Sequence, residues 1–191
     1  MNPNVEYLNS FVNVSEEMVN ELKKISVLKK IDAGTELVKL NEVPTKLYML
    51  LSGLIRCYLS TESGKNFNKS FYLPLSFVGA LTALLHKEPS KFVFEALEDS
   101  EVYEIDFDKF MNLCQNNPEI NTMYSRILEA IYTKYEKRLI DLISLNATDR
   151  YLELKKQIPN VDKLIHQYHI ASFLGITAVQ LSRIRKKIDS D

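Results

Sequence analysis

Residues 170–188 combine types and spacings that suit contact with DNA, because they fit two short helices joined by a tight turn. Ala171 is small enough for a second helix to cross closely, and Gly175 can adopt the left-handed conformation that ends a helix. Thr177 and Gln180 lie three residues apart, which predicts a capping box at the start of the second helix. The segment therefore predicts a helix-turn-helix.

The second of these helices is expected to have a buried side and a basic side. Six apolar residues are predicted to form the core that the two helices share: Ile170, Leu174, Ile176, Leu181, Ile184 and Ile188. No acidic residue occurs between Ala178 and Lys187, so the opposite side suits the major groove of DNA. The residues predicted to contact DNA are Thr177, Ala178, Val179, Gln180, Ser182, Arg183, Lys186 and Lys187.

The side chains of the basic side suit different parts of DNA. Gln180 and Arg183 can make bidentate contacts to adenine and guanine, respectively. Arg185, Lys186 and Lys187 are better suited to phosphates, which hold the register without reading the sequence. The alternative is a helical hairpin whose basic side is only solvated or contacts a partner protein.

The overall charge, the cysteines and the hydropathy of the chain restrict how it could bind DNA and where it acts. With 24 basic and 25 acidic residues in 191, the net charge is −1, so any DNA affinity must come from a local patch. Cys57 and Cys114 lie far apart and outside any CxxC pair, which favours reduced thiols and gives no support to iron–sulfur sensing. Neither a membrane-spanning run nor a signal peptide is recognisable, which predicts a cytoplasmic protein without a membrane partner.

The elements that must position the helix-turn-helix differ along the chain. Residues 14–30 have a helical period that begins with a capping signal at Ser15. Between 31 and 106, turn residues separate short strands, which predicts an antiparallel roll interrupted by a short helix at 79–86. The expected strands are 36–40, 46–51, 54–59, 66–73, 92–97 and 101–105.

A long helix is predicted from Pro118 to about Leu145, because apolar residues recur at spacings of three and four. Its stripe is wider than a coiled-coil seam, so we expect it to pack both on its own sheet and on a second subunit; a core helix of a monomer is the alternative. A further helix is predicted at 150–158, after a linker and a cap. The residues expected to form the dimer contact are Met123, Ile127, Ile131, Tyr135 and Leu139.

Over nearly its whole length the chain resembles the Crp/Fnr family of bacterial transcription regulators. The resemblance rests on the helix-turn-helix, on glycine-marked turns at 32–35, 47–53 and 77–79, and on closing strands at 95–102. Arg183 stands where the family commonly has arginine. The operator should nevertheless differ from those of well-known members, because Ala178 and Val179 replace polar residues that read bases there.

The resemblance implies an α+β fold in three parts. Residues 1–116 would form a double-stranded β-helix of the cyclic nucleotide-binding-like, jelly-roll type that acts as a sensor. Residues 117–145 would form the dimerisation helix, and residues 146–191 a winged helix-turn-helix that binds DNA. The wing is expected from residues 158–164, which precede the motif.

Members that bind cyclic nucleotides carry a glutamate after a glycine and an arginine before a small hydroxyl residue. Here Ala80 stands in place of the glutamate, and residues 87–92 contain no arginine. A cyclic phosphate would lose charge-assisted hydrogen bonds of about 1.5 to 3 kcal/mol each, so no cyclic nucleotide cofactor is expected. The degenerate effector pocket would comprise Gly79, Ala80, Leu81, Ser90 and Lys91. Ser90 or Lys91 could still hold an anion, and the cavity a different small-molecule effector.

These patterns together predict a homodimeric, sequence-specific transcription regulator that reads half-sites about one DNA turn apart. The alternative is a small-molecule-binding or protein-interaction module that does not bind DNA. His166 and His169 lack a nearby Cys or carboxylate, so no metal site is expected. Asp106 and Asp108 lie where strand ends and helix caps are expected, and no catalytic motif is present, so the sequence predicts no enzyme.

Overall fold

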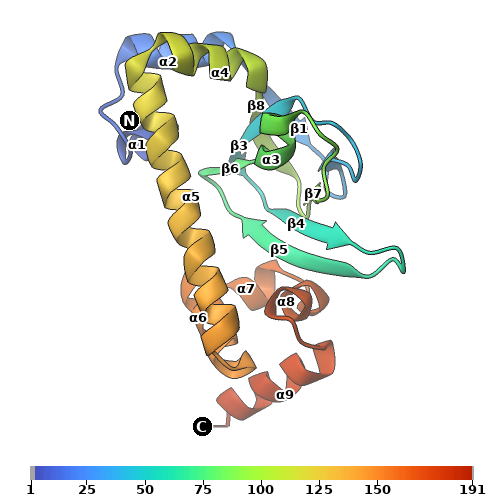
Figure 1. Ribbon diagram of the computed structural model, residues 1–191. Coiled ribbons are helices and arrows are strands. Elements are labelled where there is room, and N and C mark those ends of the chain that lie inside the picture. Colours follow the sequence, from blue (N-terminus) through green and yellow to red (C-terminus); the bar gives the residue numbers. More distant parts are fainter. Residues whose placement is uncertain (1–2, 191) are drawn as a thin grey trace. The chain divides into compact units, whose positions relative to one another are not determined.

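The chain forms two compact units in the computed structural model, which describes residues 3–190. The first unit comprises the chain up to Cys57 together with Phe71–Ile131, and the second comprises Tyr58–Ser70 together with the chain from Tyr132 onwards. Figure 1 traces the order of the elements along the chain. The division falls inside the long helix, whereas the domain bounds 1–116, 117–145 and 146–191 remain a prediction.

The strands form two four-stranded sheets, in the orders β1-β8-β3-β6 and β2-β7-β4-β5. This arrangement confirms the predicted jelly-roll-like architecture. The strands are β1 (Ser26–Ile31), β2 (Glu36–Val38), β3 (Lys46–Ser52), β4 (Ile55–Ser60), β5 (Asn66–Tyr72), β6 (Ser76–Val78), β7 (Val93–Ala96) and β8 (Ser100–Asp106). Leu50 and Val102 lie opposite one another in the β3–β8 ladder and are both fully buried, because alternate residues of a strand face the core.

The start of the roll differs from the prediction. The helix expected to reach about Lys30 ends at Lys24, and Ser26–Ile31 pairs along its length with β8 as the edge strand β1. The helical spacing of the apolar residues was misleading there, because pairing with a distant strand overrides a local period. Strand β6 was also missed, because no strand was predicted between residues 73 and 92.

The helices are α1 (Pro3–Asn9), α2 (Glu16–Lys24), α3 (Leu81–His86), α4 (Phe107–Asn116), α5 (Pro118–Ser144), α6 (Ala147–Gln157), α7 (Val161–Leu164), α8 (Gln167–Leu174) and α9 (Ala178–Ile188). The Ser15 hydroxyl accepts the Met18 amide at the start of α2, which confirms the predicted cap. Helix α5 starts at Pro118 as predicted. Helix α6 starts earlier than predicted, because the side chain of Asn146 already caps it.

The predicted wing is absent from the described C-terminal residues. Residues 158–164, from which it was expected, include the short helix α7, and no strand occurs between 132 and 190. Val161 and Ile165 are buried to 0% and 2% exposure. This segment therefore packs into its unit as a helix, whereas a wing would be an extended hairpin. Up to residue 190, the second unit thus contains the helix-turn-helix but no wing.

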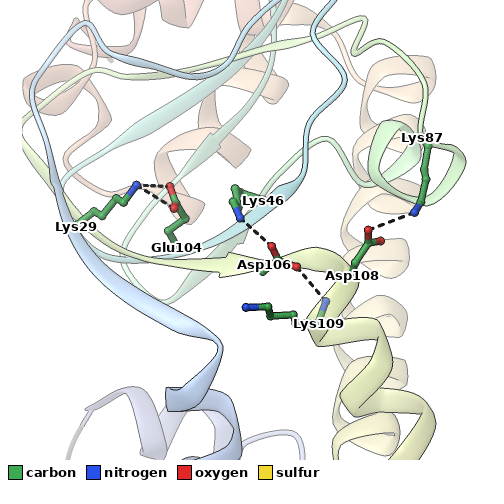
Figure 2. A network of polar contacts seen from close by, with 7 residues as sticks. All are labelled: Lys29, Lys46, Lys87, Glu104, Asp106, Asp108 and Lys109. Carbon is green, nitrogen blue, oxygen red and sulfur yellow. Dashed lines mark hydrogen bonds and ion pairs between the residues drawn. The ribbon is translucent and has the colours of Figure 1, made fainter.

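Acidic residues at the end of the roll act as caps and ion-pair partners (Figure 2). Asp106 accepts the backbone amide of Lys109 at 3.0 Å, which caps α4, and the ammonium group of Lys46 at 2.8 Å. The hydrogen bond from Lys46 is the largest cause that lowers the pKa of Asp106. Asp108 pairs with Lys87 at 3.2 Å on the surface. Asp106 therefore caps a helix at the end of a strand, as predicted, whereas the sequence did not predict the ion pairs with Lys46 and Lys87.

Candidate nucleic-acid interface

The turn between α8 and α9 has the conformation that the sequence predicts. Gly175 follows α8 with a φ of 71°, in the left-handed region, and the Ile176 amide donates to the carbonyl of Ala171 at 3.0 Å. Ala171 is 2% exposed, in agreement with its expected place beneath the crossing helix. The chain passes from Leu174 to Ala178 through only three residues, so the direction of α9 depends closely on α8.

Thr177 and Gln180 form the predicted capping box at the start of α9. The Thr177 hydroxyl accepts the Gln180 amide at 3.2 Å, and Gln180 Oε1 accepts the Thr177 amide at 2.8 Å. Gln180 Oε1 also accepts the Thr177 hydroxyl at 3.1 Å, so both of its acceptor positions are engaged and only the NH₂ group of Gln180 can contact a base while the box is closed. A bidentate contact to adenine needs both the oxygen and the NH₂ group of the side-chain amide, so it would require the box to open.

Helix α9 buries one side and exposes the other. Ile170, Leu174 and Leu181 are at most 1% exposed, which confirms the centre of the predicted shared core. Ile176, Ile184 and Ile188 are partly buried around it. On the other side, Thr177, Val179, Gln180, Arg183, Lys186 and Lys187 are exposed, and Ala178 and Ser182 are partly exposed. The structure therefore places every predicted DNA-contacting residue where its side chain is at least partly accessible.

Arg185 lies differently from what the sequence suggested. Its Nε donates to the Tyr151 hydroxyl at 3.3 Å, and its Nη2 forms an ion pair with Asp162. The Tyr151 hydroxyl in turn donates to Asp162 at 2.6 Å. Arg185 therefore has a structural role that the sequence did not predict, because its guanidinium holds α9 against α6 and α7. No sequence signal marked Asp162 as its partner, since 23 residues separate the two.

A groove of about 660 Å³ lies beside the exposed side of α9. Its lining residues are Asn146, Ala147, Thr148, Asp149, Gln180, Arg183, Ile184 and Lys187. Arg183 and Lys187 supply two positive charges, whereas Asp149 supplies one negative charge and accepts a hydrogen bond from Asn146 at 2.6 Å. The net charge of the groove is thus positive, which suits the edge of a DNA backbone.

The residues of the predicted effector pocket have few polar groups to offer a ligand. Ala80 is 8% exposed and packs in the core of the roll, and Gly79 has the Leu47 side chain 3.2 Å from where a Cβ would lie. The Ser90 hydroxyl donates to the carbonyl of Phe92 at 2.7 Å and accepts its amide at 3.2 Å. Leu81 is partly buried, and Lys91 is exposed.

A buried ion pair in the roll was missed by the sequence reasoning. Arg56 of β4 donates from Nη2 to Glu95 of β7 at 2.7 Å and from Nε at 3.2 Å, and the Arg56 side chain is only 7% exposed. β4 and β7 are neighbours in one sheet. The pairing depends on that neighbourhood, because the two residues lie 39 positions apart.

The predicted dimer stripe of α5 divides into two parts. Met123 and Ile127 are 1% and 6% exposed in the core of their own unit, so the prediction that they face a second copy is wrong. Ile131 packs against the same core, and the Lys69 ammonium group lies 4.9 Å from the centre of the Tyr135 ring. Leu139 is 58% exposed. The exposed apolar residues of α5 are Tyr132, Leu139, Ile140, Leu142 and Ile143.

His166 and His169 lie at the start of α8, where they contact the helix and one another. His166 Nδ1 accepts the Tyr168 amide at 3.3 Å and so caps α8, while the ring of His169 lies 6.4 Å from that of His166. Within residues 3–190, no three His, Cys, Asp or Glu side chains gather as a group that could hold a metal ion. In the same range, no helix combines the length and apolar character needed to cross a membrane.

Comparisons with known proteins agree on one family. The family model described as cyclic nucleotide-binding domain matches residues 28–117. The fumarate and nitrate reduction regulatory protein of Yersinia pestis is 31% identical over 188 residues, which cover 90% of this chain and 72% of that protein. The anaerobic regulatory protein of Haemophilus influenzae is 28% identical over 188 residues, which cover 90% and 70%.

A solved structure shows the same fold. FixK2 from Bradyrhizobium japonicum superimposes with a TM-score of 0.72 at 16% sequence identity, over 87% of this chain and 85% of that one. At this identity the likeness concerns the fold alone. The two relatives with higher identity are both named as regulatory proteins.

Proposed function

Because the chain belongs to the Crp/Fnr family of DNA-binding transcription regulators, we propose that it reads its operator as a homodimer through the exposed side of α9. The observation that carries this proposal is the sorting of charges on α9. Arg183, Lys186 and Lys187 are exposed on one side, whereas Arg185 is neutralised by Asp162 on the other. As a reader of bacterial DNA, the protein acts in the cytoplasm.

Individual side chains of α9 suit distinct roles. Arg183 is exposed in the middle of the helix and can bind guanine O6 and N7 in bidentate fashion. Val179, 61% exposed in the first turn, can contact the methyl group of thymine. Lys186 and Lys187 lie at the end of the helix, where they suit phosphates. The apolar first turn is why we expect an operator that differs from those read by polar residues.

The exposed apolar residues at the end of α5 suit a second copy of the chain. Leu139, Ile140 and Ile143 are 58%, 55% and 77% exposed in the single chain. A contiguous exposed apolar surface of this kind is typical of an interaction site. An antiparallel or parallel contact of two α5 helices about a two-fold axis would bury the same residues on both subunits. Two α9 helices would then read half-sites about one turn of DNA apart.

We propose that the roll has no high-affinity site for a cyclic nucleotide. Ala80 supplies no carboxylate, and the Ser90 hydroxyl is engaged with the backbone of Phe92. Thermal unfolding with and without cyclic AMP tests this proposal, because a ligand at 100 times its Kd adds about 2.7 kcal/mol of stability. We expect no change in Tm; a rise would show that the roll binds the nucleotide without these groups.

Selection of bound sequences from a random duplex library tests the function itself. The purified protein is used with and without bacterial cell extract as a source of effector. We expect enrichment of a two-fold symmetric site, with affinity that falls steeply as salt rises. No enrichment under either condition would reject the proposal and favour a module that binds a partner protein. Enrichment only with extract would identify an effector-dependent regulator.

A further inference from the structure

The last turn of α8 is held in place by other parts of the second unit. A helix leaves its last four carbonyl groups without partners inside the helix. The amides of Gly175 and Ile176 donate to the carbonyls of Ala171 and Ser172. The carbonyls of the two remaining residues, Phe173 and Leu174, therefore need donors from elsewhere.

Two arginines supply these donors. Arg138 of α5 donates from Nη2 to the carbonyl of Phe173 at 2.7 Å, and its guanidinium carbon lies 3.5 Å from the centre of the Phe173 ring. Arg150 of α6 donates from Nη2 to the carbonyl of Leu174 at 3.1 Å. Positive charge is favourable at the C-terminal end of a helix. Burial, and then the nearby charge of Arg150, lower the pKa of Arg138 to about 10, so it remains protonated at neutral pH.

The hairpin of β4 and β5 holds the same turn from another direction. The Ser172 hydroxyl donates to the carbonyl of Asn66 at 2.8 Å and accepts the amide of Asn68 at 3.0 Å. Asn68 also donates from Nδ2 to the carbonyl of His169 at 3.1 Å. Asn68 is only 4% exposed, and hydrogen bonds at buried groups are costly to lose. Three successive residues of α8, 172 to 174, are therefore bound to three different elements.

We propose that Arg138, Arg150 and Ser172 are positioning residues that set the direction of α9, an inference that rests on the proposed reading of DNA by α9. None of the three needs to touch DNA. Because only residues 175–177 separate α8 from α9, fixing the last turn of α8 fixes the direction in which α9 starts. A helix that is already oriented loses less conformational freedom when it binds, so the operator is bound more tightly.

Operator binding by variants tests this inference. We expect Arg138→Met to weaken binding to the selected operator about tenfold, as for the loss of a charged hydrogen bond. Arg138→Lys should recover part of the loss, because an ammonium group can reach a carbonyl but lacks the planar guanidinium. The dependence of affinity on salt should match that of the wild type, since no phosphate contact is removed. Ser172→Ala should weaken binding several-fold.

Matched controls separate positioning from a general effect of substitution. Lys134→Met removes an exposed cation from the same helix, and Ser144→Ala removes an exposed hydroxyl that donates to the carbonyl of Ile140, four residues earlier in α5. Both should bind the operator like the wild type. Hydrogen exchange of the Gly175 and Ile176 amides gives a readout without DNA. Exchange should be faster in Arg138→Met and Ser172→Ala than in the wild type and the controls.

The inference would be overturned by wild-type affinity and wild-type amide exchange in both Arg138→Met and Ser172→Ala. A changed salt dependence in Arg138→Met would also overturn it, because it would point to a phosphate contact. If Arg138→Met fails to fold, Ser172→Ala decides the question by the same two measurements. A wild-type protein that selects no DNA would count against the proposed function instead, and amide exchange would still test whether Arg138 and Ser172 hold the last turn of α8.

Discussion

The Tyr151 hydroxyl donates a hydrogen bond to the Asp162 carboxylate at 2.6 Å, and both groups contact the guanidinium of Arg185. Tyr151 is 1% exposed. Burial, and then the hydrogen bond to Asp162, raise the pKa of Tyr151 to about 12, so the phenol keeps its proton at neutral pH. This contact gives Arg183 and Arg185, two residues apart on α9, opposite roles.

Substitution of Asp162 should destabilise the second unit. In Asp162→Ala, the Tyr151 hydroxyl and the Arg185 guanidinium lose a shared acceptor, and we expect a loss of about 1 to 3 kcal/mol in the free energy of unfolding. Urea unfolding followed by circular dichroism measures it. Asp189→Ala, at an exposed position just after α9, is the control and should change little. An unchanged midpoint in Asp162→Ala would show that the contact contributes no stability.

Arg183→Ala should affect DNA binding and leave folding unchanged. We expect a loss of about 1 to 3 kcal/mol in binding to the operator and relaxed specificity at one base position. Arg185→Ala is the matched comparison. Because Arg185 contacts Tyr151 and Asp162, its loss should lower the midpoint of unfolding, which Arg183→Ala should leave unchanged. Lys187→Ala should weaken binding to all DNA sequences alike, and it should reduce the slope of log affinity against log salt concentration by about 1. Unchanged operator affinity in Arg183→Ala would contradict its assignment as a base-reading residue.

Gln180→Glu separates the capping role of this residue from its contact with DNA. A carboxylate can still accept the Thr177 amide, and an acidic residue is favourable in the first turn of a helix, so Tm should be kept or raised. The new negative charge would face phosphates, and we expect operator affinity to fall about tenfold or more. Thr177→Ala should cost about 1 kcal/mol of stability through loss of the cap. Strong DNA binding by Gln180→Glu would place residue 180 away from DNA.

Leu139→Arg should convert the proposed homodimer to a monomer. Leu139 is 58% exposed in the single chain, so arginine should be tolerated there without loss of folding, but it would place two charges in the two-fold contact. Sedimentation equilibrium gives the mass of the particle. Asn121→Arg, at an exposed position of the same helix, should keep the mass of the wild type. A dimeric Leu139→Arg would move the subunit contact to another surface.

Asp106 should contribute to stability in a pH-dependent way. Lys46 and the Lys109 amide hold its pKa below the usual value, so the folded state releases the proton more readily than the unfolded state. Its contribution is present above the unfolded pKa of about 3.9 and is lost as the pH falls through the folded pKa. Asp106→Asn keeps a capping side chain but not the charge. We expect it to be less stable than the wild type at pH 7, and the difference to vanish in acid; a constant difference would rule out the charge as the cause.

Much of the helix-turn-helix follows from local sequence, because its determinants lie close together in the chain. Gly175 ends α8 through its own backbone conformation, and Thr177 and Gln180 cap α9 across three residues. The core residues Ile170, Leu174 and Leu181 follow the helical period. The strands between 36 and 105, apart from β6, were found for a similar reason, since turn residues separate alternating runs and this pattern is local to the sequence.

Long-range contacts account for what the sequence left undetermined. A helical stripe shows which residues share a face but not what covers each part, so Met123 and Leu139 had the same prediction although one is 1% and the other 58% exposed. The charge run of α9 could not show that Arg185 turns inward, because Asp162 is the partner that draws it there. The strand β1 exists because β8 offers its hydrogen-bonding groups from about 75 residues away along the chain. Such pairings depend on which distant groups become neighbours when the chain folds, and the spacing of residues along the chain does not predict these neighbours.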